Sequence, residues 1–327
     1  MSLRKIGFYT LSDERCENLS ATSPMQRCEM ILTERCNFKC AYCRGLRSDC
    51  QGDMPLPRAM QVLHQWGRQG LKNIRFSGGE PLLYPGLDNL VDLAGLLGVE
   101  RIAISSNGSF PTGRYLELAE FGVNDFSISL DACCASECGK MSGVDGVQTF
   151  VRIQDNIIAL AKVTYVTVGV VLTDDNVDKL AGIVEYAHEL GVADIRIIPA
   201  AQNGCMIEGV ESLDPEIVAA HPILAYRVKN ILEGKPVRSI QEYDSHRCYL
   251  PIDDSIVCGN YHFPCVIYMR EQGEPIGEIG PDMRAERIAW SLTHNTFEDP
   301  ICRANCLDVC VDHNNKCAAC QEEYCGH

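Results

Sequence analysis

The chain has 327 residues, of which 46% are hydrophobic and 22% charged, and its formal net charge is −15. A chain of this length is longer than a single hydrophobic core usually serves, which predicts one large α/β domain and a smaller module. No apolar run reaches the length of a bilayer span, so we expect no membrane segment. The acidic charge disfavours a nucleic-acid partner, because binding a phosphate backbone requires clustered Lys and Arg.

The exceptional number in the composition is 19 cysteines. The N-terminal stretch lacks the apolar run of a secretory signal, so we expect a cytoplasmic protein. In that reducing compartment, so many cysteines predict metal or iron–sulfur ligation rather than a disulfide framework.

Short β-rich runs alternate with helical segments up to about residue 200. The helical period predicts helices over Pro57–Gln69, Gly86–Leu97 and Asp174–Leu190. This alternation is typical of βα units around a parallel sheet, and six strands fit a partial (β/α)6 TIM-like barrel better than a closed barrel of eight. The expected strands are Glu29–Thr33, Asn73–Ser77, Arg101–Ser106, Asp125–Leu130, Val166–Thr173 and Asp194–Pro199.

The pattern loosens after residue 200, where we expect one helix over Asp214–Leu232 and then a segment rich in cysteine. We therefore predict an α/β protein in three parts. These are an N-terminal extension over residues 1–27, the partial barrel over residues 28–235, and a small Cys-rich auxiliary domain over residues 236–327.

Three cysteines directly follow the first expected strand, in the segment Cys36-Asn-Phe-Lys-Cys40-Ala-Tyr-Cys43. This spacing suits a compact loop around a [4Fe-4S] cluster, and it leaves the fourth iron without a protein ligand from the loop. That iron is a place where a cofactor can coordinate. A zinc site is the alternative, although zinc is more often held by Cys-x2-Cys pairs with a fourth ligand close by.

The loop, with an aromatic residue just before its third cysteine, resembles the cluster-binding loop of the radical S-adenosylmethionine (SAM) superfamily. The resemblance implies that Cys36, Cys40 and Cys43 hold the cluster and that SAM chelates its fourth iron. It places Tyr42 near the adenine, with a simple packing role as the alternative. It further implies that reduction of SAM gives a 5′-deoxyadenosyl radical, which removes a hydrogen atom from a substrate. A reductant such as flavodoxin or ferredoxin would supply the electron.

Small and polar residues end the next three expected strands, where barrels of this kind carry their chemistry. Glycines let the backbone approach a ligand closely, a glutamate can accept from an ammonium group, and hydroxyls, amides and carboxylates can bind a ribose. Ordinary turns and helix caps are the alternative. The first of these strand ends resembles the Gly-Gly-Glu motif of the family, and the candidate SAM-binding residues are Gly78, Gly79, Glu80, Ser106, Asn107, Ser129 and Asp131.

The C-terminal cysteines resemble the opening of a SPASM or twitch domain, the auxiliary iron–sulfur module of some family members. They depart from that pattern, since five residues separate Gly259 from Cys265 where the motif has four. A structural zinc site using the Cys317-x2-Cys320 pair is the alternative. We expect an auxiliary [4Fe-4S] cluster with ligands drawn from Cys248, Cys265, Cys302, Cys306 and Cys310.

Cys138 follows the fourth expected strand closely, and it is a candidate hydrogen donor to a substrate radical, with a buried structural thiol as the alternative. An auxiliary cluster suggests oxidation, crosslinking or dehydrogenation. The short stretch before the first strand favours a small natural product or a peptide as substrate. The molybdenum-cofactor enzyme of the family has a similar loop but ends in Gly-Gly, whereas this chain ends Cys-Gly-His, so we do not assign that activity. The alternative class is a non-catalytic Fe–S or zinc protein that transfers electrons or senses redox state.

Overall fold

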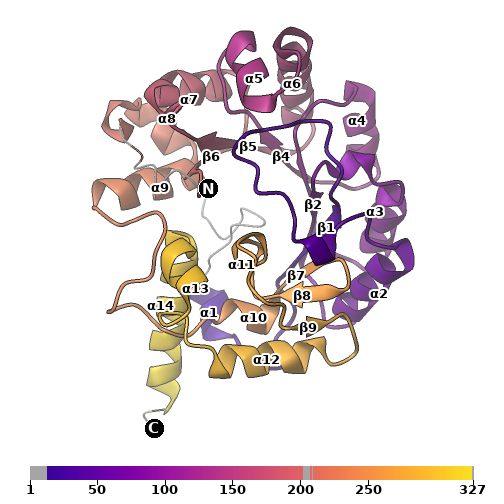
Figure 1. Cartoon of the computed structure of the whole chain (residues 1–327), viewed down its shortest axis with the longest axis vertical. Coiled ribbons are helices and arrows are strands. Elements are labelled where there is room, and N and C mark those ends of the chain that lie inside the picture. Colours follow the sequence, from indigo (N-terminus) through magenta and orange to yellow (C-terminus); the bar gives the residue numbers. More distant parts are fainter. Residues whose placement is uncertain (1–12, 202–206, 208, 326–327) are drawn as a thin grey trace.

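The computed structural model describes residues 13–201, 207 and 209–325, with side chains described as far as residue 321. Its centre is one open sheet of nine strands in the order β6-β5-β4-β3-β2-β1-β7-β8-β9. Helices coat the outer side of the first six strands (Figure 1). In the described part of the chain, no helix combines the length and apolar character that crossing a bilayer requires.

All six strands of the predicted barrel are present and pair in parallel with their neighbours in chain order. The sheet does not close, so the prediction of a partial barrel is confirmed. Each strand starts and ends within about two residues of its expected position. The strands are β1 Arg27–Thr33, β2 Asn73–Gly78, β3 Arg101–Ser106, β4 Asp125–Ser129, β5 Tyr165–Leu172 and β6 Asp194–Pro199.

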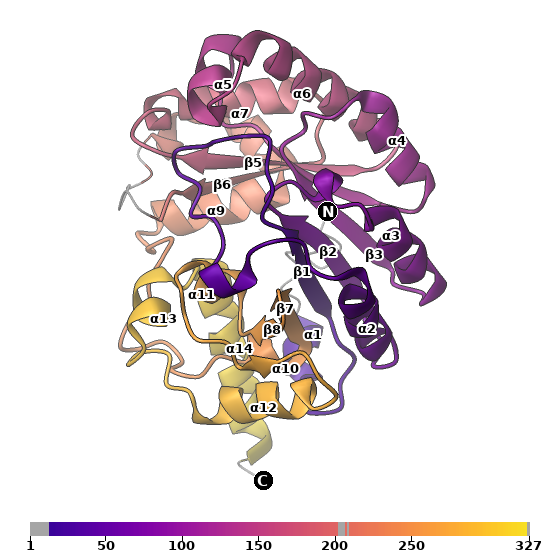
Figure 2. The same cartoon turned by 45° about the vertical axis from the view of Figure 1, so that its right-hand side comes forward.

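Helices follow the strands on the outer side of the sheet (Figure 2), and most of them bury an apolar face in the core. In the first of them, Leu63 and Trp66 are completely buried, as a helical period of apolar residues requires. The helices are α2 Leu56–Gly67, α3 Leu87–Leu96, α4 Thr112–Glu120, α5 Ala135–Ser142, α6 Gly146–Ala161, α7 Leu180–Glu189, α8 Pro215–Ala220 and α9 Pro222–Leu232.

Two expected helices differ from the structure. The helix expected over Asp174–Leu190 begins only at Leu180, because Asn176 accepts the backbone N–H of Thr173 and folds the preceding residues into a turn. The helix expected over Asp214–Leu232 is two helices, since Pro222 has no N–H to continue α8.

The C-terminal region continues the barrel sheet instead of forming a sheet of its own. Strand β7, Asp254–Cys258, pairs in parallel with β1, and β8 Tyr261–Phe263 and β9 Gly277–Glu278 follow antiparallel. Strand β7 shows no alternation of apolar and polar residues by which it could be predicted, because its residues are all buried. The division of the chain at residue 235 stays a prediction.

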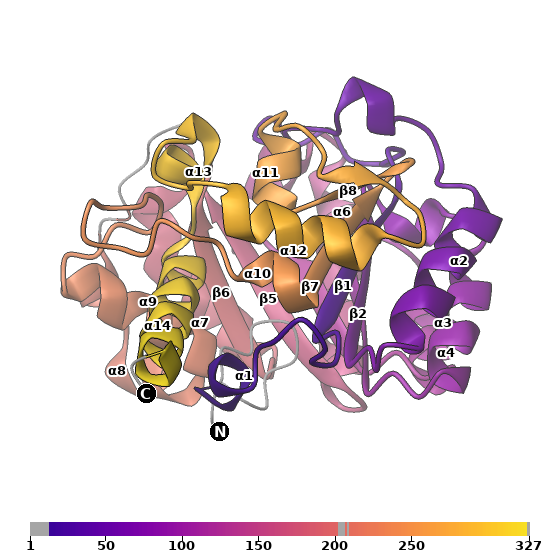
Figure 3. The ribbon, with the colours of Figure 1, turned by 90° about the horizontal axis from the view of Figure 1, so that it is seen from below.

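Short helices surround this end of the sheet (Figure 3). The N-terminal helix α1, Asp13–Glu17, lies beside the long C-terminal helix α14, Asp308–Cys325, so the two ends of the described chain meet. The remaining helices are α10 Leu250–Asp253, α11 Val266–Arg270, α12 Met283–Thr293 and α13 Pro300–Asn305.

Candidate active site

A cavity of about 260 Å³ opens at the carboxyl ends of β1 to β4. The loop after β1, the ends of β2, β3 and β4, and residues from α5 and α11 line it. Parallel strands place their carboxyl ends along one edge, which explains why residues far apart in sequence meet there. Of the candidate residues, those that line it are Cys36, Cys40, Tyr42, Cys43, Gly78, Gly79, Ser106, Asn107, Ser129, Asp131 and Cys138.

The three thiols of the β1 loop all face this cavity. Cys36 and Cys43 are exposed and Cys40 is half-buried. The backbone N–H of Phe38 donates to Cys36 Sγ at 3.4 Å. Partial burial raises the pKa of Cys36, and burial raises the pKa of Cys40 to about 11. Both are therefore protonated thiols at neutral pH until a metal displaces the proton.

The chemistry of this donor set fits a [4Fe-4S] cluster. The loop supplies three thiols to one opening, so a cluster held by the loop alone would keep one iron free for another ligand. The rest of the wall is formed by apolar side chains, hydroxyls, an amide, two carboxylates, an arginine and the thiol of Cys138. The Asn107 amide lies 3.9 Å from Cys36 Sγ, within reach of a polar contact to sulfur.

Gly78 and Gly79 pack directly against the start of the cysteine loop. A Cβ on Gly78 would lie 2.4 Å from the Thr33 carbonyl oxygen, and one on Gly79 would lie 2.3 Å from that of Arg35. The N–H of Gly79 donates to the Thr33 carbonyl at 2.7 Å. The two glycines are thus required by contact between two backbones, whatever ligand the cavity takes.

Glu80 is completely buried and is absent from the cavity wall. Its carboxylate accepts from the N–H of Leu82 at 3.1 Å, the N–H of Asn107 at 2.8 Å and the hydroxyl of Ser106 at 2.9 Å. Burial raises the pKa of Glu80 to about 7, against the effect of these three donors. In this structure Glu80 fixes the ends of β2 and β3 relative to each other, and its contact with an ammonium group stays a prediction.

Tyr42 and Asp131 join the cysteine loop to the end of β4. The Tyr42 hydroxyl donates to Asp131 Oδ2, and Asp131 Oδ1 accepts the N–H of Val171 at 2.7 Å. Burial raises the pKa of Asp131 to about 6, and the bond from Tyr42 opposes that rise. The aromatic residue before the third cysteine therefore anchors the loop, while its predicted proximity to adenine is untested.

Cys138 lines the same cavity from α5 and is 6% exposed. Its neighbours Cys133 and Cys134 do not line it. Burial raises the pKa of Cys138, so its thiol is protonated at neutral pH. Its role as hydrogen donor stays a prediction.

Two further residues of the cavity wall were not predicted from the sequence. Glu29 on β1 accepts the hydroxyl of Ser77 at 2.7 Å, and Arg270 of α11 donates to the carbonyls of Gly45 at 2.6 Å and Gly78 at 3.1 Å. A carboxylate inside an apolar strand was the available signal for Glu29. Arg270 had none, because its partners lie about 190 residues or more before it.

A second group of thiols lies beneath α11, α13 and the start of α14. All five predicted auxiliary ligands line one mainly apolar cavity there, and Cys317 and Cys320 do not line it. Cys265 occupies the N-cap of α11, where its sulfur accepts the N–H of Tyr268 at 3.3 Å, and Cys306 ends α13. The five thiols are Cys248, Cys265, Cys302, Cys306 and Cys310.

The electrostatics of this group are those of thiols that share one site. Burial raises the pKa of Cys265 to about 12, and burial also raises the pKa of Cys248 and Cys302, with each thiol adding to the rise of its neighbours. Such a site favours protonated thiols when empty and thiolates when a multivalent metal centre neutralises them.

Comparison with known proteins agrees with this arrangement. Residues 30–187 match the family model of the radical SAM superfamily. A GTP 3′,8-cyclase of Synechococcus elongatus is 28% identical over 179 residues, which are 53% of this chain and 54% of that protein. The chain thus spans about half the length of this curated relative.

Two solved structures share the fold. Streptococcus suis SuiB bound to its precursor peptide SuiA aligns with a TM-score of 0.58 and 14% identity, over 87% of this chain and 67% of that one. The enzyme anSMEcpe with bound AdoMet and a peptide aligns with a TM-score of 0.58 and 16% identity, over 85% and 82%. With the matching family model and the cysteine loop at the mouth of a partial barrel, residues 30–187 form a domain of the radical SAM superfamily.

Proposed function

We propose that this chain cleaves SAM reductively at a [4Fe-4S] cluster held by Cys36, Cys40 and Cys43, and that the 5′-deoxyadenosyl radical so formed takes a hydrogen atom from an organic substrate. The observation that carries the proposal is that these three thiols share one cavity with the ends of β2, β3 and β4. The cluster and SAM are the cofactors of the superfamily, and together they supply the one-electron chemistry.

The side chains of the protein would bind SAM and orient it. Asp131, with a pKa near 6, is mainly a carboxylate at neutral pH and is an acceptor for ribose hydroxyls. Ser129 is exposed at the end of the same strand and offers a hydroxyl. On the opposite side, Glu29 is held by Ser77 and presents a carboxylate toward a cationic group. These residues would hold the polar parts of SAM beside the thiols.

The second thiol group would hold an auxiliary [4Fe-4S] cluster. Five thiols exceed the four that one cluster needs. Cys248, Cys265 and Cys302 would be ligands, and either Cys306 or Cys310 would complete the set while the other remains free. Arg44 connects the two sites electrostatically: it follows Cys43 in sequence, and Cys265 is close enough to act on its charge. A centre at this place would accept an electron from a substrate radical or anchor the substrate, which supports oxidation, crosslinking or dehydrogenation.

For the substrate, a peptide or small natural product is our first candidate. Two proteins of the same fold were solved with a peptide bound, one of them with a precursor peptide. The similarity is one of fold, so the substrate class rests on this proposal alone.

A guanine nucleotide is the second candidate, and a specific observation favours it. Arg238 contacts no carboxylate among the described residues; it donates to the carbonyls of Pro199 at 3.2 Å and Asn305 at 3.4 Å. Burial, with the charges of Arg44 and Arg227, lowers the pKa of Arg238 to about 10. A half-buried guanidinium that no carboxylate neutralises among the described residues suits a polyanion such as the triphosphate of GTP, and relatives named GTP 3′,8-cyclase match this chain.

The test is anaerobic reconstitution with iron and sulfide, followed by iron counting and an assay for 5′-deoxyadenosine with SAM and dithionite. About eight irons per chain with 5′-deoxyadenosine formed support the proposal, and about four support only the SAM-cleaving part. Zinc in place of iron without SAM cleavage would favour the non-catalytic class. Addition of uniformly deuterated GTP then separates the substrates, because only a true substrate transfers deuterium to 5′-deoxyadenosine.

A further inference from the structure

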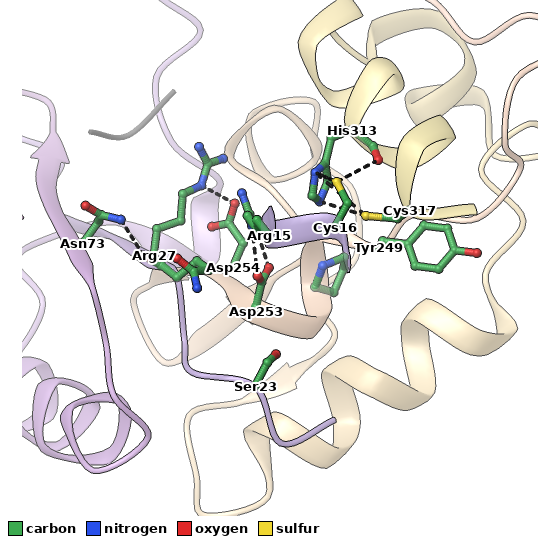
Figure 4. A network of polar contacts seen from close by, with 12 residues as sticks. Arg15, Cys16, Ser23, Arg27, Asn73, Tyr249, Asp253, Asp254, His313 and Cys317 are labelled. Carbon is green, nitrogen blue, oxygen red and sulfur yellow. Dashed lines mark hydrogen bonds and ion pairs between the residues drawn. The ribbon is translucent and has the colours of Figure 1, made fainter. Parts of the chain in front are cut away.

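A third group of metal-binding side chains lies apart from both cavities. Cys16 of α1 meets His313 and Cys317 of α14, and all three are buried, with exposed fractions of 4%, 0% and 1% (Figure 4). His313 and Cys317 are four residues apart on one helix, which places them on the same face. The group therefore joins the first and last helices of the described chain.

The distances within the group match a single tetrahedral ion. Cys16 Sγ lies 3.3 Å from His313 Nδ1, and Cys317 Sγ lies 3.9 Å from the same nitrogen and 3.6 Å from Nε2. Sulfur and nitrogen ligands on a tetrahedral zinc are separated by about 3.5 Å, since Zn–S and Zn–N bonds are about 2.3 and 2.1 Å. The three ligand atoms lie within 4.8 Å of one another.

A positively charged side chain lies beside the group. Arg15 lies close enough to Cys317 for the two charges to interact, and it is itself held by Asp253 through contacts of 2.6 and 2.9 Å. Two thiolates and one divalent cation sum to zero charge, which lowers the cost of burying the site.

We propose that Cys16, His313 and Cys317 bind a structural Zn²⁺ that fastens the N-terminal helix to α14. Cysteine and histidine ligands in a closed, buried site are the donor set of structural zinc. A cubane would hold its thiolates farther apart than this compact group does, so an iron–sulfur cluster does not suit it. Cys320 lies about one turn beyond Cys317, partly buried against the same cluster of side chains, and is a candidate for the fourth position.

The experiment uses the full chain, produced with both iron and zinc and purified anaerobically with its clusters in place. Zinc and iron per chain are measured by mass spectrometry, and the zinc ligands by X-ray absorption. We expect about one zinc with two or three sulfurs and one nitrogen. Cys16→Ser and His313→Asn should each lower zinc at least about tenfold and leave iron unchanged. Cys50→Ser, which changes a buried thiol outside the group, is the control and should keep its zinc.

Several outcomes would overturn the proposal. These are a wild type without zinc, equal zinc in His313→Asn and wild type, a loss of iron instead of zinc, or a disulfide between Cys16 and Cys317 in the purified chain. If a variant does not fold, as judged by circular dichroism, the absorption spectrum of the wild type decides, because a zinc without a nitrogen ligand contradicts the site. None of these results depends on SAM cleavage, so failure here leaves the proposed function standing.

Discussion

The buried carboxylate of Glu80 accepts the backbone N–H of Asn107 at 2.8 Å and so fastens the end of β2 to the end of β3. Ser106, the residue before Asn107, donates its hydroxyl to the same carboxylate at 2.9 Å. The sequence motif places Glu80 at the site, but the structure puts it behind the cavity wall. Glu80 thereby holds Ser106 and Asn107, which face the cavity, in place.

Glu80 should make stability depend on pH. Its pKa of about 7 in the folded chain lies above the ordinary 4.5, so the folded state binds the proton more tightly. The stabilisation is complete below pH 4.5 and is lost as pH rises through 7, by on the order of 3 kcal/mol. As pH rises over this range, the unfolding free energy of the wild type should fall by that amount relative to that of Glu80→Gln. Denaturant unfolding at a series of pH values measures it.

The control for that series is Glu120→Gln, at an exposed position of α4. Its difference from wild type should stay constant with pH. A constant difference for Glu80→Gln as well would show that the buried carboxylate does not titrate in this range.

Gly79→Ala should disrupt the cysteine loop. The added methyl group would lie 2.3 Å from the Arg35 carbonyl oxygen, which is backbone and cannot rotate away. We expect a loss of about 1 to 3 kcal/mol in stability and a lower iron content after reconstitution. Gly95→Ala in α3 is the matched control, because its methyl group meets open space and should stabilise the helix slightly. Equal iron in both variants would argue against the tight contact.

Tyr42→Phe should shift the pH dependence of SAM cleavage. The lost hydroxyl leaves Asp131 without the hydrogen bond that opposes the effect of burial, so the pKa of Asp131 should rise above about 6. Asp131 then takes up its proton at a higher pH, so the acidic limb of the plot of activity against pH should shift to higher pH. Iron content should stay normal, because the thiols are intact. Tyr243→Phe, at a side chain that is 85% exposed, provides the comparison. Superimposable profiles for all three proteins would contradict the role of Asp131.

Cys265→Ala should impair the second thiol group and leave the first one intact. We expect iron to fall from about eight to about four per chain while 5′-deoxyadenosine formation stays measurable and substrate turnover drops. The reason is that Cys265 lines only the second cavity. Cys134→Ala lies outside both cavities and should change neither value. A complete loss of SAM cleavage in Cys265→Ala would mean that the two sites are not independent.

The sequence predicted the barrel well because its strands are apolar and its helices are periodic, and both signals are local. It also brought Cys36, Asp131 and Cys138 into one site, because parallel strands share an edge. The sequence did not predict that α1 packs against α14, because Cys16 and His313 lie 297 residues apart and belong to no local pattern.

The role of individual residues was harder to predict than their position. Gly79 was expected to admit a ligand, yet its missing side chain makes room for the Arg35 backbone. Strand β7 was missed because its residues are buried on both faces and show no alternation. Such properties follow from contacts across the sheet, which a motif does not contain.

The most direct test of the central claim is SAM cleavage by Cys36→Ala beside the wild type and Cys50→Ala, which changes a buried thiol outside the cavity. All three are reconstituted anaerobically and assayed for 5′-deoxyadenosine with SAM and dithionite. The wild type and Cys50→Ala should form it, and Cys36→Ala should form none, because its cluster loses one of three thiolates. Formation of 5′-deoxyadenosine by Cys36→Ala at the rate of the wild type would contradict the assignment of these thiols.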